Sequence, residues 1–252
     1  MSDQPSVRVM TWNIHGALGR NPTFDLRRVV KLIKDHNPDI IALQEVDSRR
    51  SKAQGENPFV VLQHELGHHG ADARSIVTAD GDYGQVLLSR WPMEQWSIHD
   101  LSYPEREPRR AMEAEIKTKV GTLRVVATHL GLSLKERVSQ SRKLLDIIGP
   151  RTHTTIVLGD FNDWLWAGSV RSILKQACPG RTRFRTFPSL FPLLRLDRIY
   201  CHPANALLRS FTEPSARHIS DHLPVFADIR PARQIFEAKG EEACSLPAIA
   251  AP

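Results

Sequence analysis

The chain has 252 residues, 41% of them hydrophobic and 25% charged, which is the balance of a globular protein long enough for a full core. Its formal net charge of +6 suits a partner that carries phosphate groups. No apolar run reaches the ~18–20 residues that a bilayer span needs, so we expect no transmembrane segment.

In chain order, the first predicted element is a strand over residues 7–13, followed by a helix over 24–36 that Asn37-Pro38 ends. A second helix is predicted over 133–148, and Gly149-Pro150 ends it. Other short apolar runs predict strands. These runs cover residues 39–44, 83–89, 124–128, 154–158, 196–200 and 223–229.

Hairpin-like pairs, such as 111–118 with 122–129, alternate with strand–helix–strand units, an order that predicts an α/β fold. No Gly/Ser-rich linker divides the chain, so residues 1–232 are predicted to form a single domain. Residues 233–252 are small, polar and aperiodic, and are predicted to be a disordered tail. The chain start lacks a secretory-signal pattern and the three cysteines are scattered, so we expect a cytoplasmic protein.

Polar residues recur at the ends of the apolar strands, where a rigid scaffold can present reactive groups to a cleft. They are Asn13, Glu45, His129, Asp160, Asn162, Asp197, Asp221 and His222. Each one alone is typical of a turn or a cap. Together they combine carboxylate and amide oxygens, which suit Mg²⁺, with imidazoles, which suit proton transfer. The set therefore predicts a metal-assisted hydrolytic site.

Seven short motifs stand in the order found in the endonuclease/exonuclease/phosphatase superfamily, which the chain resembles from about residue 7 to residue 229. The motifs are TWNIHG (11–16), LQEV (43–46), LLSRWP (87–92), THL (128–130), GDFND (159–163), LDRIY (196–200) and SDHLPV (220–225). The resemblance implies a four-layer sandwich, with two mixed β-sheets packed face to face and helices outside. It also implies a Mg²⁺-dependent hydrolase of phosphoester bonds, in which Mn²⁺ can substitute.

The resemblance assigns roles residue by residue. Glu45 is similar to the principal metal carboxylate of the family, Asn13 lies beside it, and Asp221 resembles a further ligand of the metal or of its water. Asp160 and Asn162 resemble the pair that positions the attacking water and the scissile phosphate.

The resemblance also assigns an acid–base pair. His222 resembles a base or phosphate contact whose ring Asp197 orients, and His129 resembles a second histidine that donates to the phosphate or the leaving group. Which of Asp160 and His222 accepts the proton is left open.

Arg109, in the segment EPRRA, resembles an arginine that reaches the cleft and contacts the substrate phosphate. Tyr83 is interpreted as a packing aromatic, and Arg137 and Gln140 as structural residues of the second helix.

The substrate is interpreted as nucleic acid, cleaved by endonuclease- or exonuclease-type phosphodiester hydrolysis. Basic residues interleaved with aromatics favour it, and the arginines are Arg181, Arg183, Arg185, Arg195 and Arg198. The alternative is a phospholipid-headgroup phosphodiesterase similar to the sphingomyelinases, since an anionic lipid would meet the same charge. For that alternative, Trp164 and Trp166 are candidates for an apolar lip. We expect a monomer.

A different mechanism is suggested by His64, Glu65 and His68, which match the HExxH pattern of zinc peptidases. Two observations weigh against it. Gly67 weakens the helix that the pattern requires, and the following residues are predicted to be strands that offer no third ligand.

Overall fold

The computed structural model describes residues 5–19, 23–50, 55, 57–67, 69–150, 153–164 and 169–231. The tail predicted over 233–252, together with His68 and Trp166, lies outside these ranges. Among the described residues, no helix combines the length and the apolar character needed to cross a bilayer.

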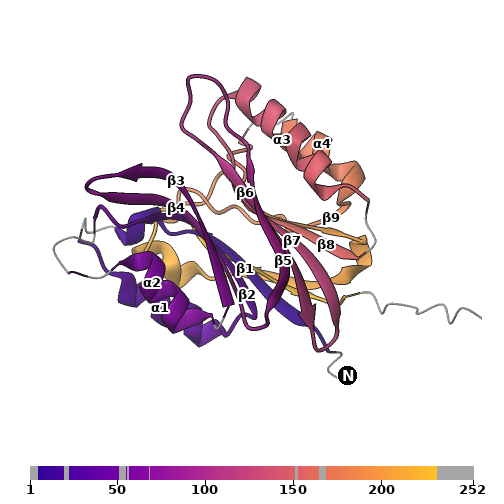
Figure 1. Cartoon of the computed structure of the whole chain (residues 1–252). Coiled ribbons are helices and arrows are strands. Elements are labelled where there is room, and N and C mark those ends of the chain that lie inside the picture. Colours follow the sequence, from indigo (N-terminus) through magenta and orange to yellow (C-terminus); the bar gives the residue numbers. More distant parts are fainter. Residues whose placement is uncertain are drawn as a thin grey trace, which may run out of the picture.

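Two six-stranded sheets form the body of the protein (Figure 1). The first contains, in spatial order, β11 (Leu207–Thr212), β12 (Val225–Ile229), β1 (Val7–Asn13), β2 (Ile40–Asp47), β4 (Gly81–Ser89) and β3 (His69–Thr78). The second contains β5 (Met93–Asp100), β6 (Arg110–Thr118), β7 (Gly121–His129), β8 (Thr154–Asp160), β10 (Asp197–His202) and β9 (Gly180–Arg181). Both sheets are mixed, because β1–β2 and β7–β8 pair in parallel and the other pairs are antiparallel.

Alternation along the strands sends side chains to two different cores. In β1, Val9 packs between the sheets, whereas its neighbour Met10 packs on the outer face. In β8, Ile156 faces the other sheet, whereas Val157 faces outward. Each sheet is therefore apolar on both faces, which explains why its strands appear in the sequence as continuous apolar runs.

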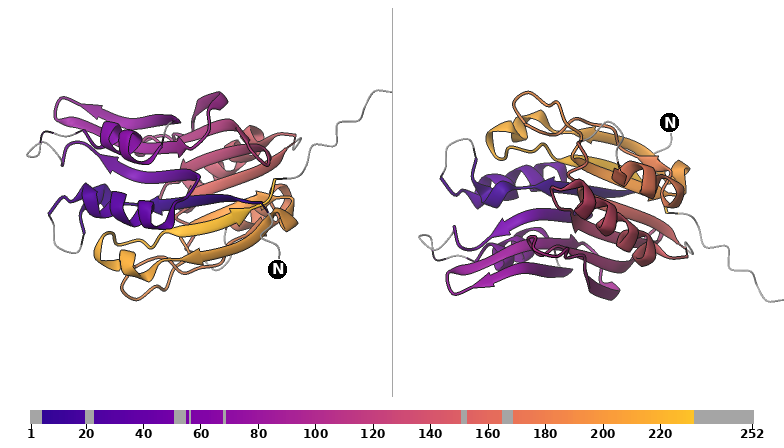
Figure 2. Two further views of the ribbon diagram at one scale, coloured as in Figure 1. Left: turned by 90° about the horizontal axis from the view of Figure 1, so that it is seen from below. Right: turned by 90° about the horizontal axis from the view of Figure 1, so that it is seen from above.

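Two pairs of helices cover the outer faces. They are α1 (Leu26–His36) with α2 (Pro58–Leu66), and α3 (Leu134–Ile148) with α4 (Ser169–Ala177). Val29 of α1 and Phe59 of α2 share a core with Trp12, whereas Leu144 of α3 and Leu174 of α4 share one with strands β7 and β8. Figure 1 shows the two pairs on opposite flanks. Figure 2 shows the C-terminal strands beside β1, to which β12 pairs. The predicted four-layer sandwich is confirmed.

Within the described residues, the helix that carries His64 ends before the HExxH pattern is complete. Helix α2 ends at Leu66, and Gly67 has extended backbone with φ −148° and ψ 133°. His64 is exposed on α2, and Glu65 forms an ion pair with Lys34. Because helix α2 ends at Leu66 and Gly67 is extended, the continuous helix that the zinc-peptidase pattern requires is not formed, which argues against the peptidase alternative.

Candidate active site

The catalytic candidates lie where the ends of neighbouring strands meet. Parallel pairing of β7 with β8 places His129 opposite Asp160, and antiparallel β10 places Asp197 opposite the same Asp160. Gly159 allows the close approach of β8 to β7, because a Cβ there would lie 1.8 Å from the carbonyl oxygen of Thr128. Register alone therefore brings three of the predicted side chains to one edge of the second sheet.

Asn13 connects this edge to the first sheet. Its Nδ2 donates to Glu45 Oε1 at 2.8 Å and to Asp160 Oδ2 at 3.1 Å, and its Oδ1 accepts the backbone N–H of His15 at 3.0 Å. Since the amide nitrogen faces both carboxylates, Asn13 orients Glu45 and Asp160 in this structure.

Unusual backbone positions two of these side chains. Glu45 has φ +58° and lies at a register shift between β2 and β4, and Asn162 has φ +49° just after β8. L-residues other than glycine rarely adopt this left-handed region, and such residues cluster at functional sites. The bulge that re-aims Glu45 was not predicted from the apolar pattern of residues 39–44.

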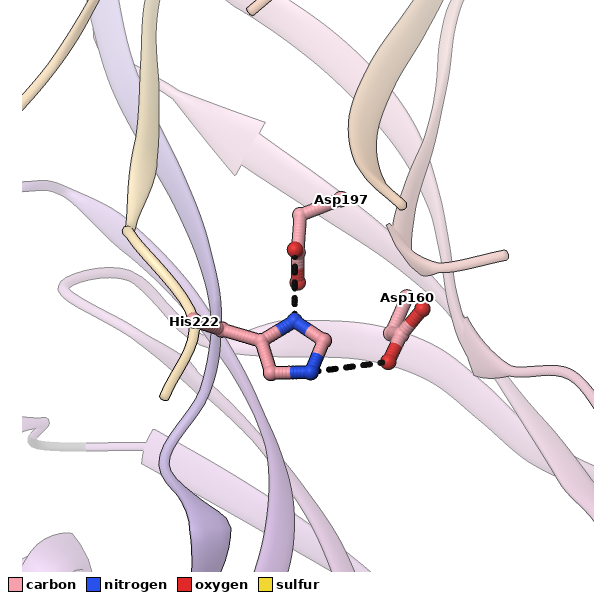
Figure 3. Close-up of side chains that lie close together, drawn as sticks. All are labelled: Asp160, Asp197 and His222. Carbon is pink, nitrogen blue, oxygen red and sulfur yellow. Dashed lines mark hydrogen bonds and ion pairs between the residues drawn. The ribbon is translucent and has the colours of Figure 1, made fainter. Parts of the chain in front are cut away.

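Asp197, His222 and Asp160 form a line of buried side chains (Figure 3). His222 Nδ1 lies 2.8 Å from Asp197 Oδ2, and its Nε2 lies 3.9 Å from Asp160 Oδ2. Burial opposes a charged ring, but the Asp197 carboxylate outweighs it and raises the pKa of His222 to about 10. The ring is therefore an imidazolium at neutral pH, with Nδ1 donating to Asp197 and an Nε2–H directed toward Asp160.

Asp160 loses its proton less readily than an ordinary surface carboxyl group. Burial and the charge of Asp197 raise its pKa to about 6. Its Oδ1 accepts the backbone N–H of Asn162 at 2.9 Å. A carboxylate whose pKa is close to neutral pH is suited to accept a proton during catalysis.

A second imidazole also lies near the same oxygen of Asp160. His129 Nε2 lies 3.6 Å from Asp160 Oδ2, while Arg109 Nη1 lies 3.1 Å from His129 Nδ1. Burial and the charge of Arg109 lower the pKa of His129 to about 3, so this ring is neutral. A guanidinium only donates, so Nδ1 is assigned as the acceptor of this 3.1 Å contact, which is shorter than the 3.4 Å approach of Asn162 Nδ2 to Nε2. The single ring proton is therefore assigned to Nε2.

Glu45 and Asp221 form the more exposed part of the site. Each has a carboxylate oxygen 3.6 Å from His15 Nδ1. Burial opposes ionisation of Glu45, but hydrogen bonds from His15 and Asn13 contribute to a net lowering of its pKa to about 2. One carboxylate oxygen of Glu45 and one of Asp221 thus lie close to the same nitrogen of His15. The hydrogen bond to Glu45 raises the pKa of the His15 imidazole. Hard oxygen ligands of this kind suit Mg²⁺.

A second group, Asp160, Asp197 and His222, also has potential ligand atoms within 4.8 Å of one another. A protonated imidazole has no free lone pair, and the Nδ1–H of His222 is already bonded to Asp197. This group is therefore the better candidate for proton transfer, and Glu45 with Asp221 is the better metal candidate.

Sequence reasoning missed two residues of the site. His15, two positions after Asn13 in TWNIHG, lies between Glu45 and Asp221. Tyr83, interpreted as a packing aromatic, is half-buried, and burial and the charge of Glu45 raise the pKa of its phenol. The signal for His15 was its place inside a recognised motif. For Tyr83, the sequence offered no signal that it would lie close enough to Glu45 to feel its charge.

Of the other side chains singled out in the sequence, some are buried and some are exposed. Arg137 and Gln140 are buried, and Gln140 Oε1 accepts the N–H of Gly131 at 2.8 Å, as expected of structural residues. Arg198 is buried and donates to Tyr200 Oη at 2.9 Å, so it is not part of a basic surface. Trp164 is 50% exposed.

A sequence model of the Endonuclease/Exonuclease/phosphatase family matches residues 10–222, which include all the candidate site residues. The chain belongs to this family. Within the family, it is 32% identical over 253 residues to Uncharacterized protein YbhP of Escherichia coli (strain K12), covering 90% of this chain and 98% of YbhP.

Two solved structures of this family's fold illustrate the likeness. An endonuclease/exonuclease/phosphatase from Beutenbergia cavernae DSM 12333 superposes with a TM-score of 0.72 at 20% identity, covering 89% of this chain and 71% of that one. A mannosyl-6-phosphatase of Bacteroides thetaiotaomicron VPI-5482 superposes with a TM-score of 0.65 at 16% identity, covering 88% and 98%. At these identities the likeness shows the fold, which members with different substrates share.

Proposed function

We propose that this protein is a Mg²⁺-dependent phosphodiesterase that hydrolyses its substrate by in-line attack of water. The observation that carries the proposal is that an imidazolium (His222) and a neutral imidazole (His129) both approach one oxygen, Oδ2 of Asp160, whose carboxyl has a raised pKa. Family membership supports phosphoester chemistry, and the site supports proton transfer and charge stabilisation at one point.

Glu45 and Asp221 would hold the metal ion, with Asn13 fixing the orientation of Glu45. Their fit rests on two carboxylate oxygens that converge on His15 Nδ1 and on a Glu45 that is ionised throughout the neutral range. When bound, Mg²⁺ would neutralise the charge that develops on the phosphoryl oxygens, a role that Mn²⁺ can also fill.

Asp160 would accept the proton of the attacking water. His222 is a poor base because Asp197 keeps its ring protonated, whereas Asp160 is ionised above about pH 6. Asn13 and Asn162 hold the two oxygens of Asp160 in place, so that the carboxylate needs no reorganisation to receive the proton.

The N–H groups around Asp160 would then contact the phosphoryl group. Nε2–H of His222 and Nε2–H of His129 point to the same region, and Arg109 lends positive charge through the ring of His129. Charge-assisted donors of this kind stabilise the negative charge of the transition state and of the leaving group.

Two substrate classes fit this site. Nucleic acid is supported by the exposed arginines at positions 183, 185 and 195. A phospholipid headgroup is supported by a specific observation, the exposed apolar side chains that border the catalytic ends of the strands. The same fold carries a sugar-phosphate phosphatase, so the fold does not choose between them.

The test is a parallel incubation of the purified protein with Mg²⁺ and plasmid DNA, an abasic-site duplex, or cardiolipin-containing vesicles. EDTA and His222→Ala are the controls, and His99→Ala, on the exposed edge strand β5, is the matched histidine variant. We expect metal-dependent cleavage of one phosphodiester that His222→Ala loses and His99→Ala retains. Turnover of none of the three, or turnover unaffected by EDTA, contradicts the proposal.

A further inference from the structure

Exposed apolar side chains gather around the catalytic end of the second sheet. Among the described residues, eleven large hydrophobic side chains are exposed, and six of them belong to three segments next to catalytic candidates. These six, called here the apolar rim, are Leu132, Leu134, Trp164, Leu190, Phe191 and Leu193. Scattered exposed hydrophobic residues need no explanation, but a group around a reactive site marks a binding surface.

The three segments lie together because their strands are neighbours. Leu132 and Leu134 follow His129 at the end of β7, and Trp164 follows Asn162 after β8. The segment that carries Phe191 precedes Asp197 at the start of β10. The order β7-β8-β10, with His129, Asp160 and Asp197 in register, puts all three segments at the same edge.

The segment with Phe191 is tied to the loop that carries His222. Phe187 and Leu194 form a bridge that closes it, and Leu193 N donates to Phe187 O at 2.9 Å. Ser189 N donates to Asp221 O at 2.7 Å, and the Phe187 ring lies 4.9 Å from that of His222. The base of the segment is thus fixed to the active site, while Phe191 at its tip is 78% exposed.

The other part of the rim is also held next to the site. Ser133 caps α3 between Leu132 and Leu134, and its hydroxyl accepts the N–H of Glu136 at 3.2 Å. Trp164 packs with its ring 5.9 Å from the buried guanidinium of Arg137, and half of its surface stays exposed. Fixed apolar groups that face solvent lose little freedom when a partner covers them.

Positive charge flanks the rim. Arg185 and Arg195 lie next to Thr186 and Leu194, where the Phe191 segment begins and ends, and Arg183 lies two residues earlier. All three are exposed, and within the described part of the chain none of them has a salt-bridge partner. Apolar tips with neighbouring arginines match an anionic lipid surface, where apolar groups enter the interface and cations meet the headgroups.

The composition of the rim argues for lipid over nucleobases. Bases bind by stacking on flat aromatic faces, and only Trp164 and Phe191 offer one. The other four members are leucines, which fit hydrocarbon and do not stack.

We propose that the apolar rim docks onto an anionic lipid bilayer and so brings the active site to the phosphodiester of a membrane lipid. This inference rests on the proposed function, because it names the substrate class of the same site. The bilayer partner is recognised by its hydrocarbon and its negative charge together.

The test is flotation of the full chain with vesicles made of equal parts phosphatidylglycerol and phosphatidylcholine, in EDTA so that no turnover occurs. We expect binding that weakens as salt rises and is weaker on pure phosphatidylcholine. Phe191→Ser with Leu193→Ser should raise the lipid concentration for half-binding by roughly tenfold or more. Arg185→Ala with Arg195→Ala should raise it by roughly tenfold or more on the anionic vesicles.

Val77→Ser is the matched control, because Val77 is 71% exposed on β3, outside the three segments of the rim. It should bind like wild type, and thermal unfolding checks that the paired variant is folded. No flotation of the wild type, or equal flotation of the Phe191 and Leu193 variant, overturns the inference. Binding of single-stranded DNA in place of vesicles that depends on the same two residues also overturns it.

The readout separates this inference from the proposed function. Asp160→Asn should float like the wild type, because binding does not need the reaction and this substitution keeps the ring contact between Phe187 and His222. Flotation without hydrolysis of any phosphodiester would support the docking surface but contradict the proposed activity. The inference that a membrane lipid is the substrate would then also be contradicted. Hydrolysis without flotation would leave the activity standing and contradict the docking surface.

Discussion

Arg109 Nη1 lies 3.1 Å from Nδ1 of His129, and this contact determines which nitrogen of the ring holds the proton. Because the guanidinium can only donate, the proton is left on Nε2, the nitrogen that faces Asp160. A neutral imidazole held in one tautomer is a defined donor toward a phosphoryl oxygen. Arg109 therefore acts on the site through His129 as well as by its charge.

Replacing Arg109 should change both the pKa of His129 and the rate of catalysis. In Arg109→Ala we expect the pKa of His129 to rise toward its ordinary value, because a nearby positive charge is lost, and kcat/KM to fall by roughly 10²–10³. Titration of the ring by NMR measures the first effect. Arg110→Ala, which removes a surface pair with Asp100, is the control. An unchanged His129 titration in Arg109→Ala would show that the contact has no electrostatic role.

The imidazolium of His222 should set the alkaline limit of activity. Its pKa of about 10 means that the protonated form is lost as pH rises through that value, so kcat/KM should decline there. Asp197→Asn removes the charge that supports the imidazolium and should move this decline to lower pH. The pH–rate profiles of the two proteins test this, and coincident alkaline limbs would refute the assigned role of Asp197.

The ionised, buried carboxylate of Asp160 should lower the free energy of unfolding, while catalysis requires it. Its folded-state pKa of about 6 lies above the ordinary 3.8, so its contribution is fully present below about pH 3.8 and is lost as pH rises through about 6. Asp160→Asn should abolish turnover and raise the free energy of unfolding by roughly 1–3 kcal/mol at pH 8, but not at pH 3.5.

Urea unfolding of both proteins in EDTA measures this difference. Asp228→Asn, at an Arg8 ion pair away from the site, is the control and should not gain stability at pH 8. A variant at position 160 that is less stable than wild type at pH 8 would contradict the burial argument.

Glu45 should carry most of the affinity for Mg²⁺. Glu45→Gln keeps the size of the side chain and removes its charge, so calorimetric titration should show binding weakened by at least about tenfold. Glu65→Gln, which disrupts an exposed pair with Lys34, should leave binding unchanged. Equal Mg²⁺ affinity in Glu45→Gln and wild type would exclude Glu45 as the principal ligand.

Most of the fold could be predicted because burial on both faces makes the strands continuous apolar runs. The strand over residues 7–13 and the end of the second helix at Ile148 were correct to the residue. The exposed edge strand β5 and the short strands β9 and β11 were not predicted, since edge strands carry few apolar residues and their pairing is set by tertiary contacts.

The identity of the site residues was more predictable than their geometry. Asn13, Glu45 and Asp160 were recognisable as strand-end polar groups, and the structure brings them into contact. The sequence did not reveal the left-handed backbone of Glu45 or the position of His15, because both depend on a register shift between β2 and β4 and on loop geometry. The extended backbone at Gly67 ends the helix that the HExxH match would need, a local feature that argues against that alternative.

The most direct test of the proposed chemistry is the rate of hydrolysis of bis(p-nitrophenyl) phosphate, compared among wild type, Asp160→Asn and His222→Ala with Mg²⁺ or with EDTA. We expect turnover by the wild type that EDTA removes, that Mn²⁺ restores, and that each substitution reduces by roughly 10³-fold or more. Turnover that persists in EDTA, or a loss of about tenfold or less in either variant, would contradict a metal-dependent mechanism centred on Asp160 and His222.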